Sequence, residues 1–116
     1  MRVLVTGGRD YRGRWVVFDV LDALHRGPEG PITVIVSGGA RGADSLGEDW
    51  AATRGVRVEV HPARWDLHGR RAGPIRNAEM LDTRPDVVVA FPGGRGTADC
   101  VAGAERRGLR VIRVGG

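Results

Sequence analysis

The chain has 116 residues, of which 41% are hydrophobic and 28% are charged. This length fits one domain and excludes a two-domain enzyme, and the balance is that of a folded protein, not a disordered one. No apolar run approaches the roughly 20 residues of a membrane helix, and the N-terminus has no signal-peptide pattern. We therefore expect one cytoplasmic domain over residues 1–116, with no membrane partner.

All 18 basic residues are arginine, and 14 acidic residues offset them to a formal net charge of +4. The calculated pI near 10.8 reflects the very high pKa of arginine, while the field at neutral pH is modest. Charge alone therefore does not predict a nucleic-acid binder. The single cysteine, Cys100, cannot form an internal disulfide, and we expect a small buried thiol.

Strand and helix patterns alternate along the chain. Short β-branched apolar runs that stop at glycine or polar residues are typical of buried strands, and apolar stripes at helical spacing are typical of one-faced helices. In chain order the pattern predicts a strand at 2–6, a helix at about 13–26, a strand at 32–36, a helix from Ala43 that Gly55 closes, a strand at 56–60, a helix at about 74–83, a strand at 86–91, a helix near 96–107 and a last strand at 109–114.

This alternation indicates an α/β fold with right-handed crossovers. We expect a Rossmann-like three-layer sandwich with a five-stranded parallel sheet, of strand order 3-2-1-4-5. Residues 61–73 are the one long stretch without a predicted element, and irregular loops of that length often line binding sites. The chemistry should lie at the carboxyl ends of the strands, where the winding of the sheet reverses.

Three glycine-rich turns follow predicted strands, and each carries an arginine. Glycine lets the backbone approach a ligand, and a helix N-terminus directs free N–H groups at an anion. The turns therefore predict a phosphate site, with tight steric packing as the alternative. Neither the dinucleotide fingerprint nor the P-loop pattern is present. The candidate contacts in the turns are Gly7, Gly8, Arg9, Asp10, Gly38, Gly39, Arg41, Asp44, Pro92, Gly93, Gly94, Gly96 and Thr97.

Four motifs span nearly the whole chain in the order VTGGRDY, VIVSGGARGADSL, AGPIRNAEML and AFPGGRGTA. Together they resemble the SLOG superfamily, and within it the small single-domain, YspA-like (cpYpsA-related) branch. The superfamily includes cytokinin-activating LOG phosphoribohydrolases and DNA-processing Smf/DprA proteins. The resemblance implies a Rossmann-like domain whose glycine loops hold a nucleotide or nucleotide-derived ligand, commonly assembled as a homodimer.

The resemblance also bears on catalysis. The phosphoribohydrolases carry P-G-G-x-G-T-x-x-E with a catalytic Glu, paired with an Arg in an R-K-x-x-M segment that Arg76 and Met80 match. Cys100 occupies the Glu position, and Asp99 lies one residue earlier, about 100 degrees away around a helix. A hydrolase would therefore depend on a displaced carboxylate, Asp99 or Glu79.

Several charged candidates have structural alternatives. Arg41 with Asp44 could clamp a phosphate, and so could Arg9 with Asp10; in each pair the alternative is a helix-capping Asp beside a solvated Arg. Trp65 in the long loop could stack on a base or cover a core edge.

Other side chains complete the set of candidates. Asn77, the only Asn or Gln of the chain, lies beside Arg76 and could contact a ribose or base, or be a surface amide. Trp15 and Trp50 fall in predicted helices, where packing is expected. His61, Asp66 and His68 are metal-ligand types within eight residues, but their spacing matches no established metal site, and we expect no metal and no cofactor.

The leading hypothesis is a nucleotide-binding module, a sensor or sequestering protein, that forms a homo-oligomer. The alternatives are an N-glycosidase or phosphoribohydrolase that acts on nucleoside monophosphates or NAD-like ligands, and a single-stranded DNA binder. The small net charge of +4 and the few aromatic residues speak against DNA.

Overall fold

Five parallel strands form a single sheet of order β3-β2-β1-β4-β5 in the computed structural model, which describes residues 1–115. Both the predicted fold class and the predicted strand order are confirmed. The elements are β1 (Arg2–Thr6), α1 (Arg14–Arg26), β2 (Val34–Ser37), α2 (Ala43–Arg54), β3 (Arg57–Val60), α3 (Trp65–His68), the 3-10 helix η1 (Gly69–Arg71), α4 (Ala72–Asp82), β4 (Val87–Ala90), α5 (Arg95–Arg106) and β5 (Arg110–Arg113).

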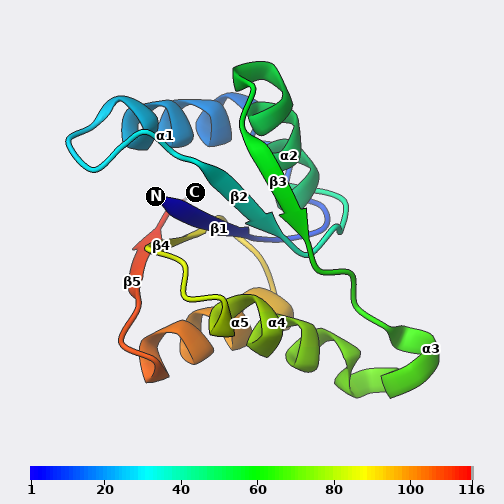
Figure 1. Ribbon diagram of the computed structural model, residues 1–116. Coiled ribbons are helices and arrows are strands. Elements are labelled where there is room, and N and C mark those ends of the chain that lie inside the picture. Colours follow the sequence, from blue (N-terminus) through cyan, green and yellow to red (C-terminus); the bar gives the residue numbers. More distant parts are fainter. Residues whose placement is uncertain (116) are drawn as a thin grey trace.

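Helices cover both faces of the sheet (Figure 1). α1 and α2 lie on one face, and α4 and α5 lie on the other. Because successive side chains of a strand point to opposite faces, Val3 and Val5 of β1 join the core under α1 and α2, whereas Leu4 joins the core under α4 and α5. Trp50 is the largest fully buried side chain and belongs to the first of these cores, as predicted.

The central and edge strands differ in burial. Every residue of β2 and β4 is buried, and so are four of the five residues of β1, which explains their continuous apolar runs. The edge strands β3 and β5 read Arg-Val-Glu-Val and Arg-Val-Ile-Arg, and none of their residues is buried. An edge strand therefore keeps polar side chains in a sheet that is otherwise apolar.

Two sequence expectations need correction. The stretch 61–73 is irregular only over residues 61–64, because it contains α3 and η1 as well as the start of α4 at Ala72. Trp15 is not buried: it is 73% exposed, although its ring meets that of Phe18 edge-on, with centroids 6.0 Å apart. It lies about 200 degrees around the helix from Val17, which faces the core. The predicted stop of α2 at Gly55 is confirmed, since this residue adopts a left-handed φ of 68°.

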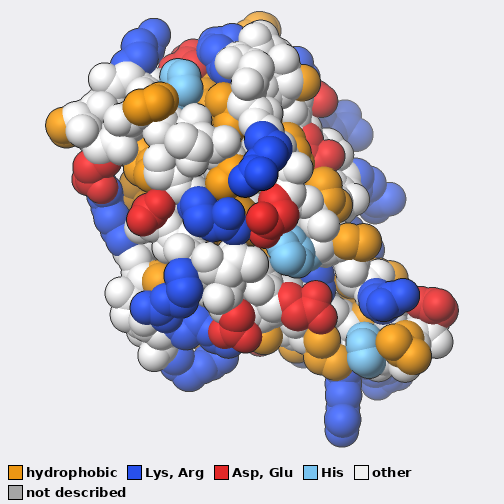
Figure 2. Space-filling model, in the orientation of Figure 1, with side chains coloured by type: hydrophobic (Ala, Val, Ile, Leu, Met, Phe, Trp, Pro, Cys, Tyr) orange, Lys and Arg blue, Asp and Glu red, His pale blue; other side chains and the backbone are white. Residues whose placement is uncertain are grey.

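The surface mixes charges of both signs. On the face shown in Figure 2, basic and acidic side chains alternate with hydrophobic ones, and the part formed by α3 protrudes from the body. Several arginines pair with carboxylates of distant elements, as Arg2 does with Glu59 at 3.0 Å and Arg54 with Asp22 at 2.8 Å. Among the described residues, no helix has the length and apolar character that crossing a bilayer requires.

Candidate functional site

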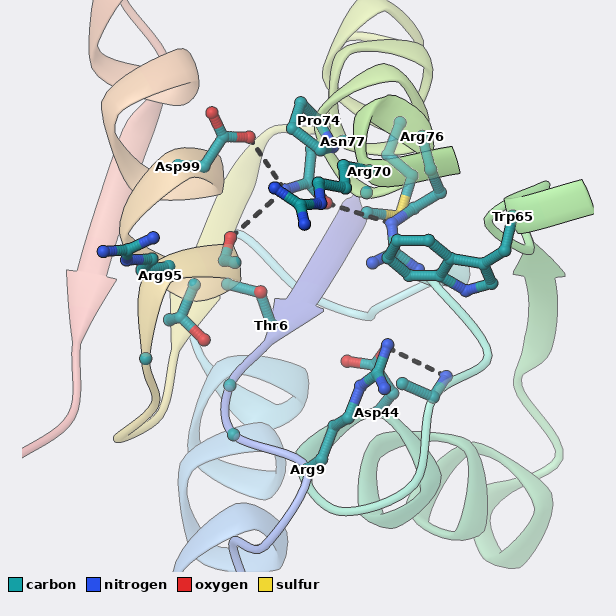
Figure 3. Close-up of a pocket in the computed structure, with 18 residues that line it drawn as sticks. Thr6, Arg9, Asp44, Trp65, Arg70, Pro74, Arg76, Asn77, Arg95 and Asp99 are labelled. Atoms are coloured by element: carbon teal, nitrogen blue, oxygen red, sulfur yellow. Dashed lines mark hydrogen bonds between the residues drawn. The ribbon is translucent and has the colours of Figure 1, made fainter. Parts of the chain in front are cut away.

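A cavity of about 650 Å³ lies at the carboxyl end of β1, between the first turns of α2, α4 and α5 (Figure 3). The parallel sheet brings the strand ends, and with them the three glycine-rich turns, to this one edge. The cavity is lined by Thr6, Gly7, Gly8, Arg9, Ala40, Asp44, Trp65, Arg70, Gly73, Pro74, Arg76, Asn77, Met80, Gly94, Arg95, Gly96, Thr97 and Asp99.

Most of the residues predicted from the sequence line this cavity. Those that do are Gly7, Gly8, Arg9, Asp44, Trp65, Arg76, Asn77, Gly94, Gly96, Thr97 and Asp99. The long stretch before α4 therefore contributes to the site, as its length suggested, although it is partly helical.

The other predicted residues lie elsewhere. Gly38, Gly39 and Arg41 line a smaller neighbouring cleft, and Gly93 lines a separate groove beside α5 and β5. Pro92 lines neither cavity nor cleft and contributes its carbonyl to a contact between turns.

Two charged candidates are surface residues. Asp10 and Glu79 are exposed, and neither lines the cavity. Asp10 caps no helix; its carboxylate lies 3.6 Å from the Arg41 guanidinium, with both side chains largely in solvent.

Sequence reasoning missed several lining residues, among them Arg70 and Arg95. Arg95 follows Gly94 in the third turn, so the arginine common to all three turns was an available signal. Arg70 lies in η1, whose short length gives no periodicity to read.

Some glycines of the turns are required by packing between the turns. The N–H of Gly8 donates to the carbonyl of Pro92 at 2.8 Å, and the Gly8 carbonyl accepts from the N–H of Ala43 at 3.1 Å. A Cβ added to Gly7 would lie 2.5 Å from the Cβ of Ala43, and one on Gly93 would lie 2.7 Å from the Gly8 nitrogen. The steric alternative therefore holds for these glycines, and their close approach joins the three turns.

The N-terminus of α5 is open to the cavity. The first hydrogen bond of this helix runs from Ala98 N–H to the Gly94 carbonyl at 3.0 Å, and no side chain caps it. Within residues 1–115, the N–H groups of Arg95, Gly96 and Thr97 donate to no protein acceptor. A Cβ built on Gly94 or Gly96 meets no atom within 4 Å. These free donors and the helix dipole suit a bound anion.

Asn77 links α4 to α5 and orients two charged side chains of the cavity (Figure 3). Its Nδ2 donates to the Gly96 carbonyl at 3.1 Å and to Asp99 Oδ2 at 3.0 Å, while its Oδ1 accepts from Arg76 Nε at 3.0 Å. Arg76 Nη1 in turn donates to the Gly38 carbonyl at 2.9 Å. Asn77 is 3% exposed, so it is a buried bridging amide and not a surface amide.

Asp44 is a buried carboxylate in the wall of the cavity. Burial raises its pKa from 3.8 to about 6, although the N–H of Ala40 and the charge of Arg76 act in the opposite direction. Its Oδ2 accepts from Ala40 N–H at 3.2 Å, so Asp44 orders the turn that precedes α2 and caps no helix. Asp44 thus combines a structural role with access to the cavity.

Cys100 is buried beneath the site. Burial raises the pKa of this thiol to about 11, which keeps it protonated at neutral pH. The predicted buried thiol is confirmed, and a protonated thiol at this position is a poor nucleophile.

The cavity combines positive charge with an aromatic side chain. Four arginines line it, against the two carboxylates of Asp44 and Asp99. Trp65 is 49% exposed, and the Arg9 guanidinium carbon lies 5.7 Å from its ring centroid. Such a site can hold an anionic ligand that carries a flat ring. Among residues 1–115, no three His, Cys, Asp or Glu side chains come together as metal ligands.

The likeness to solved structures supports the fold. DprA, DNA processing protein A of Streptococcus pneumoniae, is 18% identical with a TM-score of 0.55, over 96% of this chain and 58% of that one. Phosphoribosylglycinamide formyltransferase of Brucella melitensis is 20% identical with a TM-score of 0.56, over 97% and 55%. This chain thus spans somewhat more than half the length of each, and at these identities the likeness concerns the fold alone.

Sequence comparison identifies the family. The family model of the YspA, cpYpsA-related SLOG family matches residues 1–68, which include the first two glycine-rich turns. The Gene 61 protein of Mycobacterium phage D29 is 46% identical over 122 residues, which cover 98% of this chain and 96% of that protein. The chain therefore belongs to the YspA, cpYpsA-related SLOG family.

Proposed function

We propose that the protein binds a phosphorylated nucleotide or nucleotide derivative, as a sensor or sequestering module. The observation that carries this proposal is the open N-terminus of α5, whose free N–H groups line a cavity with four arginines. The phosphate would accept hydrogen bonds from the backbone N–H groups of Arg95, Gly96 and Thr97, and the guanidinium groups of Arg76 and Arg95 would balance its charge. A Rossmann-like SLOG domain fits such a nucleotide-related role.

The remainder of the cavity suits a nucleoside. Trp65, Pro74 and Met80 supply apolar surface for a base, and the carboxylates of Asp44 and Asp99 can accept from ribose hydroxyls. The volume of about 650 Å³ falls within the range of roughly 300–1,000 Å³ that is usual for small-molecule sites.

A second candidate function is nucleotide N-glycosidase activity. Breaking an N-glycosidic bond develops positive charge on the ribose, which a nearby carboxylate stabilises. Of the two carboxylates predicted for catalysis, Asp99 lines the cavity and is held by Asn77, whereas Glu79 is exposed and lies outside the lining. Release of free base from nucleoside monophosphates or NAD, abolished by Asp99→Asn, would establish the enzyme.

A pocket for one ligand is better supported than a groove for single-stranded DNA. Binding along a strand uses a continuous basic track with several exposed aromatic side chains. Charges of both signs alternate on the face in Figure 2, and the net charge is only +4. Tyr11 stacks on Phe91, with ring centroids 5.6 Å apart, and neither ring lines the cavity; within residues 1–115, Trp65 is the one aromatic side chain that does.

The proposal is tested by calorimetric titration with AMP and with adenosine. AMP should bind at least about tenfold more tightly, since its phosphate makes charge-assisted contacts. Arg76→Ala should weaken AMP binding by about ten- to hundredfold in samples shown to be folded. Arg12→Ala removes an exposed arginine that lines neither the main cavity nor the cleft beside it, and it should leave AMP affinity unchanged. Equal affinity for adenosine and AMP, or equal losses in both variants, would refute the phosphate site.

A further inference from the structure

A second cleft, of about 350 Å³, adjoins the main cavity. It lies over the turn after β2, and Arg9, Ala40, Trp65 and Arg76 line both spaces. A ligand seated in the main cavity therefore lies next to this cleft.

The cleft is more positively charged for its size than the main cavity. Arg9, Arg41 and Arg76 line it, and among the described residues that form its wall none is acidic. Asp10 lies 3.6 Å from Arg41, but the two side chains are 96% and 76% exposed. Such a solvated pair is weak, which leaves the Arg41 guanidinium available to a stronger anion.

Arg76 is fixed at the boundary between the two spaces. Its Nε and Nη1 are held by Asn77 and by the Gly38 carbonyl, at 3.0 and 2.9 Å. Its Nη2 donates to no acceptor within residues 1–115, so this half-buried guanidinium keeps unused donors. A guanidinium with free N–H groups, held in place, is suited to a phosphate oxygen.

We propose that the cleft is a second phosphate subsite, and that the preferred ligand is a nucleotide that carries a second phosphate group. This inference rests on the proposed function: one phosphate lies at the N-terminus of α5, and the other lies between Arg41 and Arg76. Trp65 and Arg9 line both spaces, so the ligand contacts them where it extends from the main cavity into the cleft. A nucleoside monophosphate occupies the main cavity alone and leaves Arg41 in water.

The test compares three adenine nucleotides: AMP, ADP and adenosine 3′,5′-bisphosphate. Their dissociation constants are measured for wild type, Arg41→Ala, Arg76→Ala and Arg12→Ala. At least one of the two doubly phosphorylated probes should bind wild type about tenfold more tightly than AMP. This ratio should fall to near one in Arg41→Ala and persist in Arg12→Ala, which removes the same charge from an exposed position outside both spaces.

The other outcomes separate the two proposals. If all three nucleotides bind wild type equally and Arg76→Ala weakens them all, the second subsite is refuted and the main site stands. If the affinity ratio of the doubly phosphorylated probe to AMP falls equally in Arg41→Ala and Arg12→Ala, the tighter binding comes from the overall positive charge of the protein and not from Arg41. This result also refutes the subsite. If none of the three nucleotides binds, both proposals fail.

Discussion

Asp44 carries a carboxylate in surroundings that disfavour its charge. The residue is 6% exposed, and burial raises its pKa above the usual 3.8. Because the folded protein holds this proton more tightly than the unfolded chain does, the free energy of unfolding falls as the pH rises from the unfolded pKa to the folded one. The charged form then persists at neutral pH at the expense of stability, which is typical of carboxylates kept for a function.

Asp44→Asn should remove this pH dependence. The amide is neutral, and its oxygen can still accept from Ala40 N–H. Relative to wild type, the variant should gain up to about 3 kcal/mol of stability between about pH 4 and pH 8, because a pKa rise from 3.8 to about 6 corresponds to this amount. Urea unfolding of both proteins at the two pH values measures the gain. If the free energies of unfolding of the two proteins differ by the same amount at both pH values, Asp44 does not titrate in this range.

At the scale of elements, the third glycine-rich turn joins β4 to α5 and contains glycines with different roles. Gly93 approaches the backbone of the first turn closely, whereas a Cβ on Gly94 would extend into open space. Gly94 has a φ of −101°, so no left-handed conformation demands glycine there. Neither packing nor backbone conformation requires glycine at position 94. Free N–H groups of the helix lie beside it, so the absence of a side chain is explained by the space that a ligand needs.

Gly94→Val should therefore separate binding from stability. The free energy of unfolding should change by less than about 1 kcal/mol, while AMP affinity should fall at least about tenfold. Ala98→Val, one turn further along α5 and outside the main cavity, is the matched control. Calorimetry and urea unfolding measure the two quantities. Normal AMP binding by a folded Gly94→Val protein would show that this turn has only a structural role.

The sequence contains enough information to predict these elements but not all of their contacts. Strand runs and glycine stops are local, so β1 and the end of α2 were predictable to the residue. The burial of Asn77 depends on α5 packing against α4, about twenty residues further along the chain, and no local pattern reports such a contact. α3 has four residues, too few for a helical stripe, which is why its segment reads as a loop.

At the scale of the whole molecule, the sheet order follows from the alternation of strands and helices with right-handed crossovers. The predicted order already places β3 and β5 at the edges, and the polar residues of Arg-Val-Glu-Val and Arg-Val-Ile-Arg agree with that position. The protruding α3 leaves large hydrophobic side chains in solvent beside the cavity: Trp65 is 49% exposed and Leu67 64%. A second subunit that covers them would also enclose the site.

We therefore predict a homodimer through this surface. Sedimentation at micromolar concentration should give about twice the chain mass of 12.4 kDa. Leu67→Asp should shift the protein toward the monomer, since it places a charge in the apolar contact. Val16→Asp, at an exposed apolar position on α1, should not. A wild-type mass equal to that of one chain would contradict the prediction.

The central claim is that a nucleotide phosphate binds at the N-terminus of α5, and nuclear magnetic resonance tests it most directly. In a titration of isotope-labelled protein with AMP, the amide protons of Arg95, Gly96 and Thr97 should shift downfield together and saturate, because these free N–H groups gain a charged acceptor. Adenosine should leave these three signals nearly unchanged. If AMP saturates the protein and the three amides do not move, the phosphate lies elsewhere and the proposed site is wrong.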